Sequence, residues 1–148
     1  GACIKTKAVE AKCQGAVINT FGGNRVSAAT GLAVINTIQE EKLMENAKVV
    51  GGYLMDGLKD LQKSFPIIGD LRGKGLMVGI EIAEPETKRP MAAECARIVE
   101  TAKDLKVVIG KGGLYAKPPL TITKQDVDRC LSAMRKGLES VCAVGAAK

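Results

Sequence analysis

A hydroxyl group and two glycines stand together in Thr20-Phe21-Gly22-Gly23-Asn24, directly before a helical pattern that begins near residue 25. Such residues at the start of a helix can offer free backbone N–H groups, the positive end of the helix dipole and a side-chain donor. Proteins bind phosphate with this chemistry. A plain turn and helix cap uses the same residue types, so the residues alone leave both interpretations open.

Two other glycine-rich stretches do not fit nucleotide-binding motifs. Between Gly69 and Lys74 the spacing is one residue shorter than that of a Walker loop, and Gly75 stands where that motif has Ser or Thr. Gly73, Gly75 and Gly79 are spaced one residue too widely for a dinucleotide fingerprint, and they precede a strand pattern instead of opening a helix. We therefore predict a tight turn that feeds a strand here, and another turn at residues 110–113.

The residue types also exclude several kinds of site. The sequence has no histidine, and its five cysteines form no CxxC pair. A Cys/His zinc site is therefore excluded, as is every mechanism in which histidine is the base, and no metal site is predicted. Widely spaced cysteines are typical of small hydrophobic residues in a reducing compartment. They are Cys3, Cys13, Cys95, Cys130 and Cys142.

The composition is that of a folded protein. The 148 residues are enough for one domain or parts of two, and 46% of them are hydrophobic. The net charge of +6 comes from scattered residues, and only 3% of the residues are aromatic, so nucleic-acid binding is not expected. No apolar run is long enough to span a membrane. The chain starts at Gly1, which we interpret as a processed or excised sequence from which a targeting segment would have been lost.

Hydrophobic periodicity predicts helix in the first half of the chain. The helical pattern extends from about residue 25 to 63, with an interruption near residues 39–42. Residues 26–38 are apolar on several faces, so we expect them to be buried on more than one side or, in an isolated chain, to cause self-association. Before this region, residues 1–19 are predicted to be irregular, with a short strand near residues 16–18.

The second half of the chain mixes strands and helices. We expect a strand at residues 76–82, a helix over residues 92–105 and short strands at residues 107–109 and 120–122. This order favours an α/β or α+β fold in which two helices cover one face of a sheet.

A last helix is predicted from about residue 124. Thr123 and Asp126 have the spacing of a capping box at its start. Its apolar side chains recur at helical spacing. They are Val127, Leu131, Met134, Leu138 and Val141.

Three stretches, in this order, resemble segments of the class III aminotransferases, fold-type I enzymes that depend on pyridoxal phosphate (PLP). They are residues 19–24, residues 68–81 (IGDLRGKGLMVGIE) and residues 118–123 (PPLTIT). With the helix between the first two, the resemblance covers residues 1 to about 141. Arg89-Pro90-Met91 and residues 109–115 are most similar to mitochondrial-type alanine–glyoxylate aminotransferases, the plant forms especially. Ornithine, acetylornithine and 4-aminobutyrate aminotransferases share the same framework.

The resemblance implies a homo-oligomeric mitochondrial enzyme that uses PLP to transfer an amino group from an amino acid such as alanine to glyoxylate or another 2-oxo acid. Thr20 would donate a hydrogen bond to the cofactor phosphate of the neighbouring subunit. Residues 1–64 would be the end of the large PLP-binding domain and the interdomain helix. Residues 65–148 would be the C-terminal small domain.

Two departures from the family pattern set limits on that implication. The Schiff-base lysine of the family would lie upstream of Gly1, and Lys5, Lys7 and Lys12 do not match its motif, so no catalytic residue is assigned. Where the family has a carboxylate-binding arginine, this chain has Tyr115 in a shortened loop. Lys117 carries a positive charge there, but its ammonium cannot form the two parallel hydrogen bonds that an arginine makes to a carboxylate. We therefore expect a C-terminal fragment that is inactive alone. The alternative is a non-catalytic α/β interaction module from a truncated or spliced form.

Overall fold

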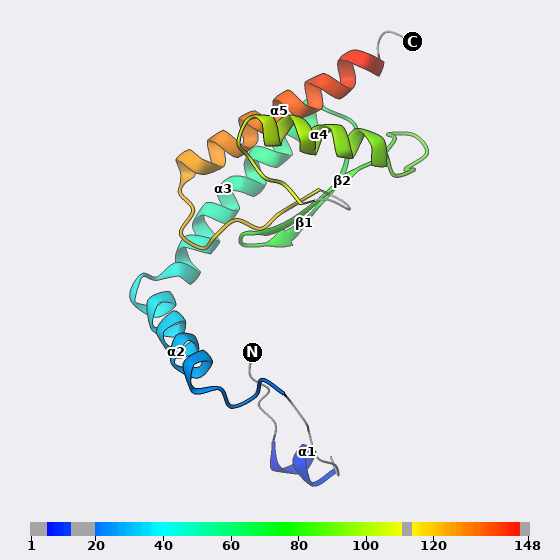
Figure 1. The fold of residues 1–148 in the computed structure, drawn as a ribbon. Helices are drawn as coiled ribbons and strands as arrows, with labels where there is room; N and C mark the ends of the chain where they lie inside the picture. The colour runs from blue at the N-terminus through cyan, green and yellow to red at the C-terminus, as the bar shows by residue number, and fades with distance from the viewer. Residues whose placement is uncertain (1–5, 13–19, 111–113, 146–148) are drawn as a thin grey trace. The chain divides into compact units, whose positions relative to one another are not determined.

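The computed structural model describes residues 6–12, 20–110 and 114–145, which belong to two compact units, residues 1–36 and 37–148 (Figure 1). The helices and strands in chain order are α1 (Lys7–Lys12), α2 (Arg25–Glu40), α3 (Leu43–Ser64), β1 (Ile68–Lys74), β2 (Met77–Ile82), α4 (Ala92–Asp104), β3 (Leu114–Ala116) and α5 (Lys124–Gly145).

The two predicted helices of the first half are confirmed, and so is the interruption between them. α2 ends at Glu40 and α3 begins at Leu43, while Lys42 adopts a left-handed φ of 52°. A non-glycine residue in that region breaks the helical hydrogen-bond ladder, which separates the two helices. The strand predicted near residues 16–18 lies outside the described residues.

The burial of α2 distinguishes between two expectations for residues 26–38. They were expected to be buried on more than one side or, in an isolated chain, to leave an exposed apolar patch. No side chain of α2 is buried, so the first alternative is wrong for this chain and the exposure required by the second is present. Val26 is 76% exposed, Leu32 61% and Ile35 54%. The apolar side chains of α2 are therefore in contact with solvent.

The segment before the predicted strand is itself a strand, which corrects the interpretation of residues 69–75 as a turn. β1 and β2 form an antiparallel hairpin in which Lys74 pairs with Met77 across a two-residue turn. Gly75, the first residue of that turn, has a φ of +57°, and glycine adopts this value without strain. Alternation of Asp70, Arg72 and Lys74 on an exposed face is typical of an edge strand, and the glycine spacing concealed this pattern.

The third strand is also displaced from its prediction. Residues 107–109 and 120–122 are not strands, whereas Leu114–Ala116 form β3, which pairs antiparallel with β2. Ile109 and Ile122 are buried, with 8% and 7% exposure, so each short apolar run anchors a connecting segment in the core without joining the sheet. A short apolar run in the sequence does not indicate whether the segment is a strand or a buried connection.

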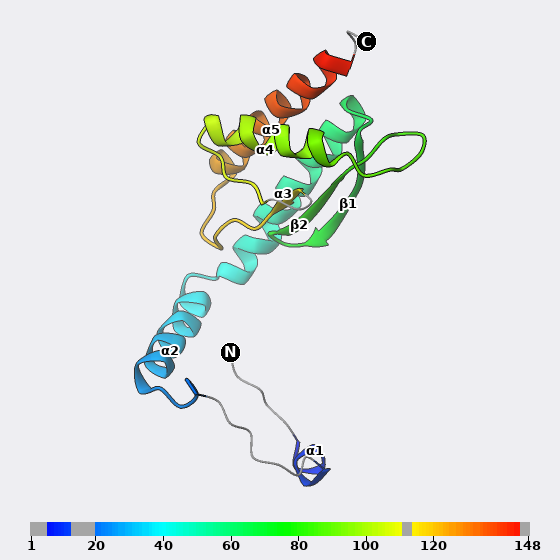
Figure 2. The same cartoon turned by 45° about the vertical axis from the view of Figure 1, so that its right-hand side comes forward.

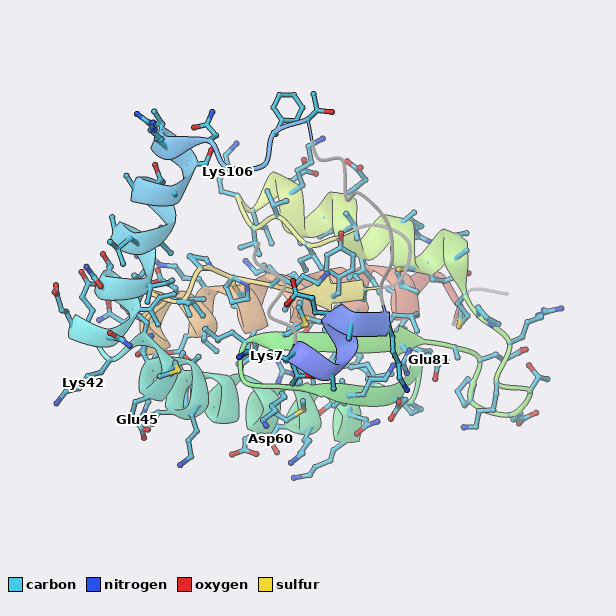
Figure 3. The ribbon with its side chains drawn as sticks, turned by 90° about the horizontal axis from the view of Figure 1, so that it is seen from below. Lys7, Lys42, Glu45, Asp60, Glu81 and Lys106 are labelled. Atoms are coloured by element: carbon cyan, nitrogen blue, oxygen red, sulfur yellow. The ribbon has the colours of Figure 1, made fainter. Side chains whose placement is uncertain are left out.

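Three helices pack over the sheet, where two were predicted. α3, α4 and α5 share one hydrophobic core with the face of β2 that buries Val78, Ile80 and Ile82 (Figures 1 and 2). The acidic side chains of Glu45 and Asp60 project from α3 away from the sheet (Figure 3).

The last helix is confirmed in its stripe and in its cap. Val127, Met134, Leu138 and Val141 are buried, and Leu131 packs against the same core. The N–H of Asp126 donates to Thr123 Oγ1 at 3.3 Å, and the N–H of Thr123 donates to Asp126 Oδ2 at 3.1 Å. These reciprocal bonds are those of a capping box.

Candidate cofactor and substrate site

Thr20 begins a turn over residues 20–23 that leads directly into α2. Gly23 has a φ of +73°, a left-handed conformation that favours glycine. Asn24 caps the helix, because its Oδ1 accepts the N–H of Ser27 at 3.0 Å and its carbonyl accepts the N–H of Ala28 at 3.0 Å. The turn and the cap are thus both present, while Thr20 is exposed.

The electrostatics of this turn suit an anion. The first turn of α2 contains no acidic residue and begins with Arg25. The positive end of the helix dipole therefore meets no local negative charge. With the exposed Thr20, these features fit a phosphate group.

The fit concerns the phosphate alone. No described residue matches the family's Schiff-base lysine, the aspartate that pairs with the pyridine nitrogen or the aromatic residue that stacks on the ring. Lys7 and Lys12 are the first and last residues of the short helix α1, in which nothing is buried. Neither lysine has the desolvated surroundings that activate an amine nucleophile. Lys5 lies outside the described residues.

Tyr115 lies in β3, paired with Gly79 of β2. Its ring covers Gly110, where an added Cβ would lie only 1.9 Å from Tyr115 Cζ. The Lys117 ammonium sits 4.6 Å from the centre of the same ring. Tyr115 and Lys117 are therefore neighbours, and a carboxylate approaching Lys117 would meet a single ammonium without a bidentate partner.

The described cysteines belong to no disulfide bond and to no metal-binding cluster. They are Cys95, Cys130 and Cys142. Burial, with a smaller contribution from Asp126, raises the pKa of the Cys130 thiol, so it is not a thiolate nucleophile at neutral pH. Within the described ranges, no group of three or more His, Cys, Asp or Glu residues could hold a metal ion. No helix there is both long and apolar enough to cross a bilayer.

One surface feature of the structure was not predicted from the sequence. A groove of about 720 Å³ lies between α3, the β1–β2 turn and residues 117–120. The signal that points to it is the small-residue face of α3, formed by Ala47, Gly51 and Gly52, with methionines at both ends.

Comparison with solved proteins defines the class. An amine transaminase from an uncultivated Pseudomonas species, solved in its PLP-bound form, superposes with a TM-score of 0.78 and 29% sequence identity. The match covers 83% of this chain and 29% of that one. The fold is therefore that of part of a fold-type I PLP-dependent transaminase.

The family follows from the sequence. The family model for class III aminotransferases matches residues 1–138, and this chain belongs to that family. It is 48% identical over 122 residues to alanine–glyoxylate aminotransferase 2 homolog 2, mitochondrial, of Arabidopsis thaliana, which covers 78% of the chain and 26% of that protein. It is 39% identical over 127 residues to the Homo sapiens alanine–glyoxylate aminotransferase 2, mitochondrial, covering 81% of the chain and 25% of that protein. The chain thus spans about a quarter of the length of these curated relatives.

Proposed function

We propose that this chain is the C-terminal part of an aminotransferase that moves an amino group from an amino acid such as alanine to glyoxylate or another 2-oxo acid. The family match over residues 1–138 carries this proposal. Residues 1–64 supply the end of the large domain and the interdomain helix, and residues 65–148 supply the small domain. Two relatives are named as mitochondrial, which supports the same location for this chain. We further propose that the whole enzyme is a homo-oligomer.

Thr20 is the residue that we assign to the cofactor. Its hydroxyl and the start of α2 hold the phosphate of PLP, with the exposure of Thr20 and the absence of acidic residues in the first turn as support. When bound, PLP supplies the electron sink for removal of a proton from the substrate amino acid. Fixing the phosphate fixes the position of the reacting ring.

The 148-residue chain alone is inactive in this proposal, because no residue of it matches the Schiff-base lysine. General acid–base catalysis accelerates a reaction by about 10²–10⁴-fold, and loss of the positioned amine lowers the rate by at least that factor. The chain is incubated with PLP, alanine and glyoxylate, and pyruvate is measured. No pyruvate is expected. Turnover that is abolished by Lys5→Ala, Lys7→Ala or Lys12→Ala would refute the assignment of inactivity.

A second experiment separates a part of an enzyme from the alternative, a non-catalytic interaction module. This chain replaces the matching segment of the Arabidopsis relative, whose upstream part remains. An aminotransferase segment gives a folded chimera with the visible absorbance of bound PLP. Thr20→Val then weakens PLP binding by about tenfold, as expected for loss of one charge-assisted hydrogen bond. A folded chimera that binds no PLP would instead favour the module.

The same chimera tests Tyr115. If Lys117 binds the substrate carboxylate less well than the family's arginine does, the chimera binds PLP but has a raised KM for the amino acid. Tyr115→Arg is expected to lower that KM. An unchanged KM would show that the shortened loop keeps residue 115 away from the substrate carboxylate.

A further inference from the structure

The groove between α3 and the β1–β2 turn combines an apolar floor with a basic rim, and we call it the basic groove. Its apolar lining includes Met44, Met55 and Met77, and its charged lining consists of Lys48, Lys74 and Lys117. Met44 is 71% exposed and Met77 is 63% exposed. Large apolar side chains gathered in a concave surface mark a binding site more often than scattered ones do.

Two adjacent glycines of α3, Gly51 and Gly52, form part of the floor of the basic groove. An ideal Cβ on Gly51 would lie 2.4 Å from the carbonyl carbon and oxygen of Gly75, so α3 and the hairpin touch there. A Cβ on Gly52 would meet nothing within 4 Å. The space above Gly52 is therefore open to an incoming side chain.

The charge in the basic groove has one sign. Its lining contains three lysines and no acidic residue. Among the residues that the structure describes, none of the three lysines has a recorded ion pair, and Lys117 rests against the ring of Tyr115. An acidic partner is therefore favoured by charge complementarity.

We propose that the basic groove binds an acidic amphipathic helix of a partner protein. Met44 and Met55 are eleven residues apart on α3, so the floor extends for about 16 Å, the length of three helical turns. Methionine side chains adapt to apolar residues of different shape, and a helix laid in such a groove presents one apolar stripe to them. Acidic residues beside that stripe reach the three lysines. This proposal uses neither Thr20 nor the cofactor.

The test uses the whole 148-residue chain and two synthetic peptides. Both are 14-residue amphipathic helices with leucine at helical spacing, one flanked by glutamate and the other by lysine at the same positions. Binding is measured by calorimetry, and the contact surface is mapped by amide chemical-shift changes. The glutamate peptide is expected to bind at least tenfold more tightly than the lysine peptide, with shifts at residues 44–55 and 73–77.

Three variants locate the site. The variant Lys48→Glu/Lys74→Glu/Lys117→Glu is expected to lower the affinity for the glutamate peptide at least tenfold. Exposed ion pairs contribute measurably to binding when three of them act together. Lys88→Glu/Lys106→Glu/Lys136→Glu makes the same charge change outside the groove and is expected to leave binding within twofold. Gly52→Leu places a side chain in the open space above position 52, where its Cβ meets nothing within 4 Å, so it is expected to block binding while the unfolding midpoint is maintained or raised.

The other outcomes overturn the proposal. Equal affinity for both peptides, or shifts confined to α2, would show that the basic groove does not select an acidic helix. Binding of phosphatidylserine vesicles without binding of the glutamate peptide would assign the surface to a membrane. Dimerisation that Gly52→Leu abolishes, again without peptide binding, would assign it to a second copy of the chain.

Discussion

Adjacent glycines in α3 have different environments, which shows how closely the fold depends on single positions. Gly51 is buried against the backbone of Gly75, and an ideal Cβ there would lie 2.4 Å from its carbonyl atoms. Gly52 is exposed and has no heavy atom within 4 Å of its ideal Cβ. Of these two positions in α3, only position 51 therefore requires glycine for the contact between helix and hairpin.

Substitution by alanine should have opposite effects at these two positions. Gly52→Ala is expected to stabilise the chain by about 1 kcal/mol, because alanine loses less backbone entropy than glycine in a helix. Gly51→Ala is expected to destabilise it by about 1–3 kcal/mol, because helix and hairpin must separate to admit the methyl group. Urea unfolding of both variants measures the difference. Equal effects at the two positions would contradict the close contact.

The capping box of α5 makes stability depend on pH. Hydrogen bonds from the Thr123 hydroxyl and N–H lower the pKa of Asp126 from its ordinary value of 3.8. A carboxyl whose pKa is lower in the folded state contributes stability above its unfolded pKa, and that contribution is lost as the pH falls through the folded pKa.

Asp126→Asn should therefore lower the urea midpoint at pH 7, and its difference from the unmodified chain should be smaller at about pH 3, below the ordinary pKa of 3.8. Glu86→Gln changes one charge in the exposed loop between β2 and α4, so it serves as the matched control and should have little effect at either pH. A deficit of Asp126→Asn that persists unchanged in acid would show that the carboxylate does not act through these hydrogen bonds.

At the scale of elements, side-chain amides fasten irregular segments to α3. Asn46 Nδ2 donates to the carbonyls of Leu120 at 2.7 Å and Ile122 at 3.1 Å. Gln62 Nε2 donates in the same way to the carbonyls of Ile68 at 3.3 Å and Gly69 at 2.9 Å. The first amide holds the segment that follows β3, and the second holds the start of β1.

Asn46→Ala should loosen the segment after β3 without unfolding the chain. Two carbonyls lose their donor, and water replaces it only in part, so a cost of about 1 kcal/mol is expected. Amide hydrogen exchange should rise at residues 120–123 and stay unchanged at residues 68–69. Gln62→Ala should give the opposite pattern. Faster hydrogen exchange throughout the chain in either variant would mean that the side-chain amides of Asn46 and Gln62 do not act locally.

The elements that the sequence predicted are those with long periodic patterns. α3 and α5 repeat an apolar residue at every third or fourth position over 22 residues each, so helix is the one structure that buries their stripes. β1 was missed because its glycines concealed the alternation of its exposed residues, although its pairing with β2 is local. β3 was missed because pairing with a strand distant in the sequence determines it. Leu114–Ala116 is a strand because β2 offers it an edge, and three residues contain no period to detect.

The candidate site was predictable only in part for the same physical reason. The turn and cap at Thr20–Asn24 depend on local hydrogen bonds, which residue types and spacing indicate directly. The basic groove brings α3, the hairpin turn and residues 117–120 together, so no stretch of sequence contains its pattern. Local features follow from the sequence, whereas sites assembled from distant segments require the fold.

At the scale of the whole molecule, burial divides the chain unequally between its two units. The described core belongs to residues 43–141, in the second unit, whereas no residue of α1 or α2 is buried. Hydrophobic stabilisation follows the apolar area removed from water, so the second unit supplies the folding free energy. α2 contributes exposed apolar area instead, which is the surface that self-association would remove from water.

Replacing Leu32 and Ile35 by lysine should therefore change association and leave folding unaffected. Both side chains are more than half exposed, at 61% and 54%, so charges are accommodated there without disturbing a core. In sedimentation, the unmodified chain should show an apparent mass that rises with concentration, because α2 covers its apolar side chains in a second copy. Leu32→Lys/Ile35→Lys should stay at the monomer mass of 15.5 kDa, with an unchanged unfolding midpoint. Thr30→Lys/Thr37→Lys adds the same charge on the opposite side of the helix and should still associate, which separates loss of apolar contact from simple charge repulsion. A concentration-independent monomer for the unmodified chain would contradict the prediction, and a collapsed midpoint for Leu32→Lys/Ile35→Lys would show that α2 packs into the chain's own core.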